Sequence, residues 1–333
     1  MKKFLILLLL ISLPLSAEHE HTENFYFESF LHTFACMHND NDAAHFRYYQ
    51  NDSHIKHWYE WWYFNVKNGS KALLLYFFTF GNLNKPTKSI VGIVTAFFNG
   101  NESIVSITSY PFIDYSLDYE KFNITVAGNR AYKTGNEYII NYKARNIEIV
   151  AKMESRGIPF GGVPTMLDKW QWMAWYVAMP YGNASVTIET NGGKCKFKGM
   201  AYHDHNWGIA KAMQLKWDWG EFCNGNSSII YGIANDIGGL YFVNESMVRQ
   251  YNISLSYEKW IFINGFIKPS LIHIFSQDKK IDLYVEMKKA YVLGIKNFGK
   301  PYLLGKMHGS FYGSSITAIG FYEHHGFVIT AML

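Results

Sequence analysis

The densest group of chemically capable side chains lies at residues 202–208, which have the sequence Tyr-His-Asp-His-Asn-Trp-Gly, and Trp-Asp-Trp-Gly-Glu follows at 217–221. In an extended strand, alternate side chains share a face. One face of this segment then carries Tyr202, Asp204 and Asn206, and the other carries His203, His205 and Trp207. Such a set can form a buried hydrogen-bond network, hold a metal ion or transfer a proton.

The metal hypothesis rests on His203 and His205, which would share one face of a strand. A third ligand would have to come from another strand, and the candidates are Glu221, His324 and His325. No His-x-x-Glu-His or similar zinc spacing occurs in the sequence. We therefore expect no metal.

The proton-transfer hypothesis rests on carboxyl groups close to aromatic runs: Glu60, Asp204, Asp218 and Glu221. Burial raises the pKa of a carboxyl group, which can then donate a proton at neutral pH. The faces of Trp and Tyr rings stabilise a developing cation by about 1–2 kcal/mol each. Each of these acids can equally be a core residue whose hydrogen bonds are all made within the protein.

A Gly-x-Ser-x-Gly elbow, a phosphate loop and a dinucleotide fingerprint are absent from the sequence, so hydrolase and dehydrogenase functions have no support.

The elements that must position these groups are strands. After residue 45, runs rich in Tyr, Phe, Trp, Ile, Val and Thr recur between Gly/Asn turns, with almost no helical periodicity. At 60–65, Glu60, Trp62 and Phe64 would share one face. About sixteen strands are more easily two barrels than one. We expect an all-β chain of two antiparallel β-barrels side by side, at 46–194 and 195–333, with the boundary at the Asn-Gly-Gly-Lys segment 191–194.

The N-terminus has the layout of a signal peptide at about 1–17: two lysines, an apolar run from Phe4 to Leu15, then Ser16 and Ala17. Twelve apolar residues rise only about 18 Å as a helix, which is too short to cross about 30 Å of hydrocarbon. We expect cleavage rather than a permanent anchor. Residues 18–45 are rich in His, Asn and Asp, and we interpret them as a tail or a strap across a barrel mouth.

Acceptor triplets for N-glycosylation also indicate export. Random placement would give roughly three in a chain of this composition. The sequence has eight, which begin at Asn51, Asn68, Asn101, Asn123, Asn183, Asn226, Asn244 and Asn252. An Asn-rich sequence can produce them by accident. With the signal peptide, they favour a secreted glycoprotein with these sites on its surface.

Composition limits the classes of molecule that this protein is expected to bind. The net charge of +4 is small and dispersed, which excludes a nucleic-acid-binding protein of the basic-patch type. Aromatic residues make up 18% of the chain, which indicates wide internal surfaces lined with rings and an apolar small-molecule ligand.

The three cysteines, Cys36, Cys195 and Cys223, allow at most one disulfide bridge within the chain. Whether Cys195 and Cys223 form it cannot be decided from the sequence.

Three segments together resemble the hydroxyneurosporene synthase (carotenoid 1,2-hydratase) or AttH-like family: Glu-Trp-Trp-Tyr-Phe at 60–64, residues 202–208, and Gly-Phe-Tyr-Glu at 320–323. The resemblance implies two lipocalin-like (calycin) barrels, a ligand cavity within or between them, and no organic cofactor. The family includes carotenoid hydratases and fungal enzymes that guide cycloadditions. It also implies that His205 and Trp207 form a His-x-Trp pair acting on an alkene with a nearby acid, for which Asp236 lies in about the right part of the chain.

Two main hypotheses follow. The first is a secreted hydratase, cyclase or isomerase of an apolar polyene or isoprenoid, with His205, Asp204 and Asp236 in catalytic roles. The expected binding residues are Glu60, Trp62, Tyr202, His203, Asn206, Trp207, Trp217 and Trp219. The second is a lipocalin-like carrier of the same ligand class. A third function, cell-surface interaction, would require an exposed apolar patch and a cavity too small for a ligand.

Overall fold

The computed structural model describes residues 41–100, 102–110, 114–211, 215–295 and 298–325. The expected signal peptide, most of the expected tail at 18–45, Cys36 and Asn101 lie outside these ranges. Within them, no helix has the length and hydropathy needed to cross a membrane. The helical segments there are one turn of α-helix, α3 (Phe46–Tyr49), and two 3₁₀ turns, η1 (Ile55–His57) and η2 (Pro86–Lys88).

Two antiparallel sheets account for nearly all of the described chain. The first has thirteen strands: β1 (Trp58–Lys67), β2 (Lys71–Gly81), β3 (Ser89–Asn99), β4 (Glu102–Tyr110), β5 (Tyr115–Leu117), β6 (Asn123–Val126), β7 (Asn129–Thr134), β8 (Glu137–Ala144), β9 (Ile147–Ser155), β10 (Phe160–Gly161), β11 (Thr165–Asp168), β12 (Gln171–Thr190) and β13 (Gly193–Ile209). Its order is β4-β3-β2-β1-β13-β12-β9-β8-β7-β6-β5, with β10 and β11 paired to β12.

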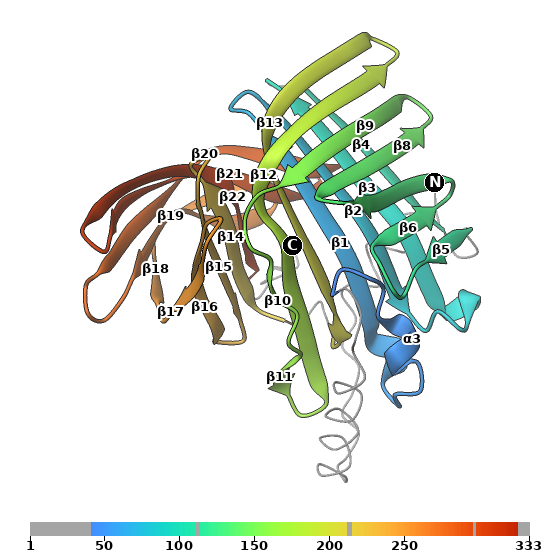
Figure 1. The fold of residues 1–333 in the computed structure, drawn as a ribbon, viewed down its shortest axis with the longest axis horizontal. Helices are drawn as coiled ribbons and strands as arrows, with labels where there is room; N and C mark the ends of the chain where they lie inside the picture. The colour runs from blue at the N-terminus through green and yellow to red at the C-terminus, as the bar shows by residue number, and fades with distance from the viewer. Residues whose placement is uncertain (1–40, 101, 111–113, 212–214, 296–297, 326–333) are drawn as a thin grey trace.

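The second sheet has nine strands: β14 (Trp217–Cys223), β15 (Ser228–Ala234), β16 (Ile237–Val243), β17 (Val248–Tyr251), β18 (Ser254–Ile263), β19 (Phe266–Phe275), β20 (Ile281–Ile295), β21 (Phe298–Phe311) and β22 (Ser314–His325). Its order is β17-β16-β15-β14-β22-β21-β20-β19-β18. Both sheets curl into half-barrels that lie side by side (Figure 1). The prediction of an all-β chain with two lipocalin-like antiparallel units is confirmed.

The predicted boundary at 191–194 does not separate the two sheets. This Gly/Asn-rich segment is the turn of the long β12–β13 hairpin, and both of its strands belong to the first sheet. The chain passes to the second sheet only between Ile209 and Trp217. The reason for the difference is that β13 returns to pair with β1, whose residues lie about 140 positions earlier. A turn within a sheet and a linker between two sheets have the same Gly/Asn composition.

The alternation along β1 and β13 follows from the period of a strand, and it decides which groups face which core. The inner face of the first half-barrel carries Trp62, Phe64 and Trp207 within its own apolar core. The opposite face packs against the second sheet through a separate apolar cluster that includes Tyr63, Tyr202, Ile230, Tyr302 and Phe321. The sequence analysis likewise placed Trp62 and Phe64 on one face of their strand, and Trp207 and Tyr202 on opposite faces of theirs.

A buried ion pair also joins the two sheets. Lys67 of β1 donates to both carboxylate oxygens of Glu221 of β14 at 2.7 Å. Asn65 contacts both partners, and the backbone N–H of Phe321 donates to Glu221 at 3.0 Å. Both charges are buried and each is hydrogen-bonded, so we expect the pair to favour this arrangement of β1 against β14.

Residues 41–50, which we call the strap, pack inside the first half-barrel. Asp42 to Phe46 are buried, although this stretch includes an acid and a histidine. The Trp62 indole donates to the backbone carbonyl of Asp42 at 3.0 Å, and Tyr138 donates to its carboxylate at 2.9 Å. The backbone N–H of Ala44 donates to the backbone carbonyl of Asp118 at 2.9 Å. The strap therefore brings polar side chains into contact with β1 and β13.

Candidate functional site

Two polar centres lie on opposite faces of β1 and β13. The inner centre consists of Asp42 and His45 of the strap, Glu60 of β1, and His203 and His205 of β13. The inter-sheet centre consists of Asp204 and its three donors, Tyr202, Trp175 and Asn206. Their separation follows from the strand period, because neighbouring residues of β13 point to opposite faces.

Hydrogen bonds fix both β13 histidines of the inner centre. The Nδ1 atom of His203 lies 2.9 Å from the carbonyl oxygen of Tyr63, and Nδ1 of His205 lies 3.1 Å from that of Asn41. A carbonyl oxygen only accepts, so each Nδ1 carries a proton. The two Nε2 atoms then face carboxylates: Asp42 at 3.1 Å from His203, and Glu60 Oε1 at 3.0 Å from His205.

Stacked rings enclose these imidazoles. Phe64 stacks on His203 with ring centroids 3.8 Å apart, and Trp62 stacks on His205 at 4.5 Å. Trp207 stacks on His45 at 3.8 Å and is tilted against His205 at 4.7 Å. His203, His205 and Glu60 are fully buried, so the inner centre is filled with packed side chains.

Burial sets the protonation of the inner centre. Desolvation lowers the pKa of His45 to about 3 and that of His205 well below its usual value. It raises the pKa of Glu60 well above the usual range, although the backbone N–H groups of His45 and Phe46 oppose that shift. The Oε2 atom of Glu60 is buried and has no hydrogen-bond partner among the described residues. Burial therefore favours the neutral form of each of these three groups.

The inter-sheet centre is built around one carboxyl group. Oδ2 of Asp204 accepts from the Tyr202 hydroxyl at 2.8 Å and from Trp175 Nε1 at 3.1 Å, and Oδ1 accepts from Asn206 at 3.1 Å. Burial raises the pKa of Asp204 to about 7, while its bonds to Tyr202 and Trp175 act in the opposite direction. This is a carboxyl group fixed in position that can hold or release a proton near neutral pH.

Half-exposed aromatic rings border Asp204 from both sheets. Trp61 and Trp175 lie on the strands that flank β13, where both pair with Asn206. Trp219 of β14 contacts the rings of Tyr63 and Tyr202 edge-on, with ring centroids 5.6 Å apart in each pair. The Tyr76 hydroxyl is buried without a hydrogen-bond partner in the described part of the chain. An acid, several ring faces and an unpaired hydroxyl are therefore grouped on the side of β13 that faces the second sheet.

The predicted site residues divide between the two centres. His203, His205, Glu60, Trp62 and Trp207 belong to the inner centre or its rings, whereas Tyr202, Asp204, Asn206 and Trp219 face the second sheet. Trp217 lies near the second group, where its indole donates to Glu323 at 3.3 Å and stacks on His325.

The structure does not bring Asp236 to His205. Asp236 is exposed in the turn between β15 and β16, with a positive φ of 67°. The acid within hydrogen-bond distance of the His205 imidazole is Glu60, which the sequence analysis placed among the binding residues. The residues considered as a third metal ligand are also elsewhere: Glu221 pairs with Lys67, and His324 contacts Asp218.

Cys195 and Cys223 are both free thiols, so no disulfide bridge joins them.

Sequence reasoning missed Asp42, His45 and Trp175. The first two lie in the segment interpreted as a tail or strap, and its excess of His, Asn and Asp was the available signal. Trp175 gave no signal, because one more Trp in an aromatic strand is indistinguishable from a core residue.

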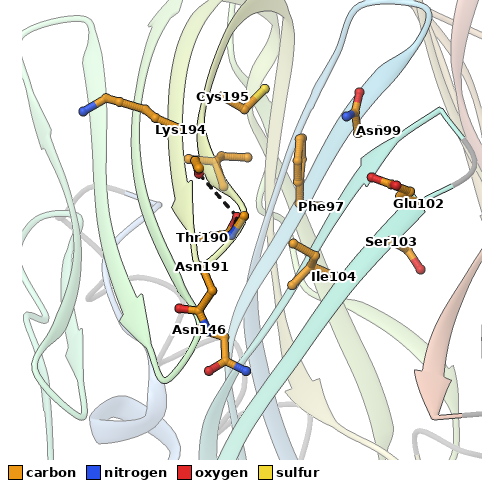
Figure 2. Close-up of a pocket in the computed structure, with 13 residues that line it drawn as sticks. Phe97, Asn99, Glu102, Ser103, Ile104, Asn146, Thr190, Asn191, Lys194 and Cys195 are labelled. Carbon is orange, nitrogen blue, oxygen red and sulfur yellow. Dashed lines mark hydrogen bonds between the residues drawn. The ribbon is translucent and has the colours of Figure 1, made fainter.

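A separate pocket of about 520 Å³ lies at one end of the first half-barrel, between the turns β3–β4 and β12–β13 (Figure 2). Phe97, Ile104 and Ile188 contribute apolar walls, and Asn99, Glu102 and Lys194 contribute polar ones. None of the predicted site residues lines it. Both centres are therefore distinct from this pocket.

The chain matches no protein-family model and no curated protein in sequence. Its fold is similar to the crystal structure of a protein from Nitrosomonas europaea provisionally assigned as an AttH. The two share 11% identity, with a TM-score of 0.59 over 80% of this chain and 93% of the other. This chain has the AttH-like fold. CghA shares it at 9% identity, with a TM-score of 0.54 over 82% of this chain and 90% of CghA. A structure of CghA with Sch210972 gives a TM-score of 0.51 at 10% identity.

Proposed function

We propose that this chain is a secreted AttH-like enzyme that transfers a proton to the double bond of an apolar polyene or isoprenoid-type molecule, with Asp204 as the acid. The observation that carries the proposal is the position of Asp204: a buried carboxyl group, held by three donors, beside half-exposed indole rings. Asp204 takes the catalytic role rather than His205, because the His205 imidazole is enclosed beneath the strap.

The chemistry is the addition of a proton to an alkene. The π electrons of the double bond form a C–H bond with the Asp204 proton, which leaves a carboxylate on the protein and a cation on the neighbouring carbon. Tyr202, Trp175 and Asn206 stabilise the carboxylate through their hydrogen bonds. The faces of Trp61 and Trp219 would stabilise the cation by about 1–2 kcal/mol each.

The cation then has three outcomes, each with a balanced proton count. Water adds to it and returns a proton to Asp204, which is hydration. A proton leaves the adjacent carbon for Asp204, which is isomerisation of the double bond. A second double bond of the same molecule adds to it before a proton is lost, which is cyclisation. The carotenoid 1,2-hydratase resemblance favours hydration, and the structure of CghA with Sch210972 supports ligand binding by this fold.

The test is proton transfer in D₂O with a defined panel of probes: lycopene, squalene and all-trans-retinol. Mass spectrometry should detect products that have gained one deuterium by exchange or the mass of one D₂O by hydration. The Asp204→Asn variant should lower this rate at least about 100-fold, since a positioned acid typically contributes that much. Quenching of tryptophan fluorescence by retinol should report nearly unchanged affinity, because Asn keeps the shape of the side chain.

The matched control is Asp236→Asn, which removes an exposed turn carboxyl group and should leave the rate unchanged. If the wild-type protein binds retinol tightly and introduces no deuterium into any probe, the carrier function replaces the enzyme. If Asp204→Asn retains the full rate, the acid is a different residue and the proposal is wrong.

Export is part of the same proposal. Seven of the eight acceptor asparagines lie among the described residues; Asn51, Asn68, Asn183, Asn226 and Asn252 are exposed, and Asn123 and Asn244 are half-buried. None is buried, which is compatible with glycan attachment. Secreted protein from a glycosylating host should begin near Glu18 and lose mass on treatment with a peptide N-glycosidase. An intracellular protein that retains Met1 and carries no glycan would contradict this part.

A further inference from the structure

We propose that His45, Glu60 and His205 bind one divalent first-row transition-metal ion inside the first half-barrel, and that this ion fastens the strap to β1 and β13. The three side chains come from three separate segments of the chain, and their ligand atoms all lie within 4.8 Å of one another. Two imidazole nitrogens and one carboxylate are a donor set that zinc and iron(II) use in proteins.

The spacing of the donor atoms fits an ion. Nδ1 of His45 lies 3.3 Å from Oε1 of Glu60, and Nε2 of His205 lies 3.0 Å from the same oxygen. Ligand atoms bonded to tetrahedral zinc at about 2.0–2.1 Å are roughly 3.3 Å apart. The two imidazole nitrogens lie within 4.8 Å of each other, so they would have to move closer together to complete the coordination.

The hydrogen bond on the far side of His205 points to the same conclusion. Metal-ligating histidines usually donate the other ring N–H to a backbone carbonyl or a carboxylate, which fixes the tautomer. Nδ1–H of His205 donates to the carbonyl of Asn41, so the lone pair of Nε2 points at Glu60. Two electron pairs that face each other at 3.0 Å require a positive particle between them, either a proton or a metal ion.

The surroundings of Glu60 favour a metal ion over a proton between its carboxyl group and His205. A proton on Oε1 satisfies the contact with His205 but leaves Oε2 buried and without a partner among the described residues. A buried, unpaired carboxylate oxygen is costly. An ion that Glu60 binds through both oxygens, or through one oxygen and a bound water, satisfies Oε2 as well. The enclosed position beneath the strap assigns the ion a structural role, independent of Asp204 on the opposite face.

The experiment measures metal content and coordination on the full chain. Protein with a non-histidine affinity tag is refolded with Zn²⁺, Co²⁺ or Fe²⁺, desalted and analysed by elemental mass spectrometry. We expect one ion per chain, and visible absorption bands of tetrahedral Co²⁺ in the cobalt-loaded protein. Loading should raise the melting temperature by about 5 °C or more. The element retained from the native host identifies the ion.

Glu60→Gln and His45→Ala should each lose the bound ion and the Co²⁺ bands, whereas His54→Ala, a partly exposed histidine outside the group, should keep both. Because a variant in this buried group can fail to fold, the wild-type protein gives the decisive result. A wild-type chain that folds, retains no ion after refolding with any of the three metals and shows no Co²⁺ bands would overturn the proposal. Retained ion with unchanged binding in both variants would overturn the ligand assignment.

Discussion

Asp204 and His205 are adjacent in the sequence, but they contact different layers of the molecule. Asp204 accepts hydrogen bonds from Tyr202 and Trp175 at the interface between the sheets, whereas His205 contacts Glu60 and the strap inside the first half-barrel. A substitution at one position should therefore affect one centre and spare the other, provided that β13 stays paired with β1 and β12.

The Lys67–Glu221 pair gives the sharpest test of the contact between the sheets. Lys67→Met should destabilise the protein by about 3–5 kcal/mol in urea unfolding, because it leaves the Glu221 carboxylate buried without its cation. Lys152→Met, an exposed lysine of β9, is the control and should change stability by less than about 0.5 kcal/mol. The double variant Lys67→Met/Glu221→Leu should recover part of the loss. A single variant as stable as wild type would show that the pair does not hold the sheets together.

Gly320, in one of the three segments that carry the family resemblance, should tolerate no side chain. A Cβ atom at this position would overlap the backbone carbonyl of Glu221 in the neighbouring strand β14. We expect Gly320→Ala to cost about 1–3 kcal/mol or more in thermal or urea unfolding. Gly192→Ala is the matched control, since its nearest neighbour would be the Thr190 hydroxyl at 3.7 Å. Equal stability of the two variants would contradict the close approach of β22 to β14 at Gly320.

Gly232 of β15 tests whether the ligand lies against Trp175. A Cβ atom at Gly232 would meet Cζ3 of the Trp175 indole at 2.5 Å, so Gly232→Ala should displace the ring from its position beside Asp204. We expect about a tenfold loss of retinol affinity, measured by fluorescence quenching, with a smaller change in melting temperature than that of Gly320→Ala. Unchanged affinity for retinol would place the ligand away from this ring.

The two described cysteines should differ in reactivity. Burial raises the pKa of the Cys223 thiol, which lowers the thiolate fraction, and the side chain is also shielded from reagents. Cys195 is half-exposed and lines the 520 Å³ pocket. Iodoacetamide at pH 8 should label Cys195 in the folded protein and Cys223 only after unfolding, as peptide mapping would report. Labelling of both at the same rate would show that β14 is open to solvent.

Strand periodicity predicted most of the fold, because alternation along residues 60–65 and 202–208 depends only on backbone geometry. The same argument placed His205 and Asp204 on opposite faces, as observed. It could not pair Glu60 with His205, because the register of β1 against β13 joins residues 145 positions apart and depends on packing. The boundary at 191–194 failed for a related reason, since turn composition does not reveal which strand follows.

The place of β13 in the first sheet also has a consequence for synthesis. β13 separates β1 from β12, so neither strand has its native neighbour on that side until residues 193–209 have left the ribosome. More than half of the chain is therefore synthesised while the facing edges of β1 and β12 are still unpaired. Contacts between residues so distant in sequence also form slowly. Both polar centres need this strand, so they are assembled together, late, and only after the first half-barrel closes around its final hairpin.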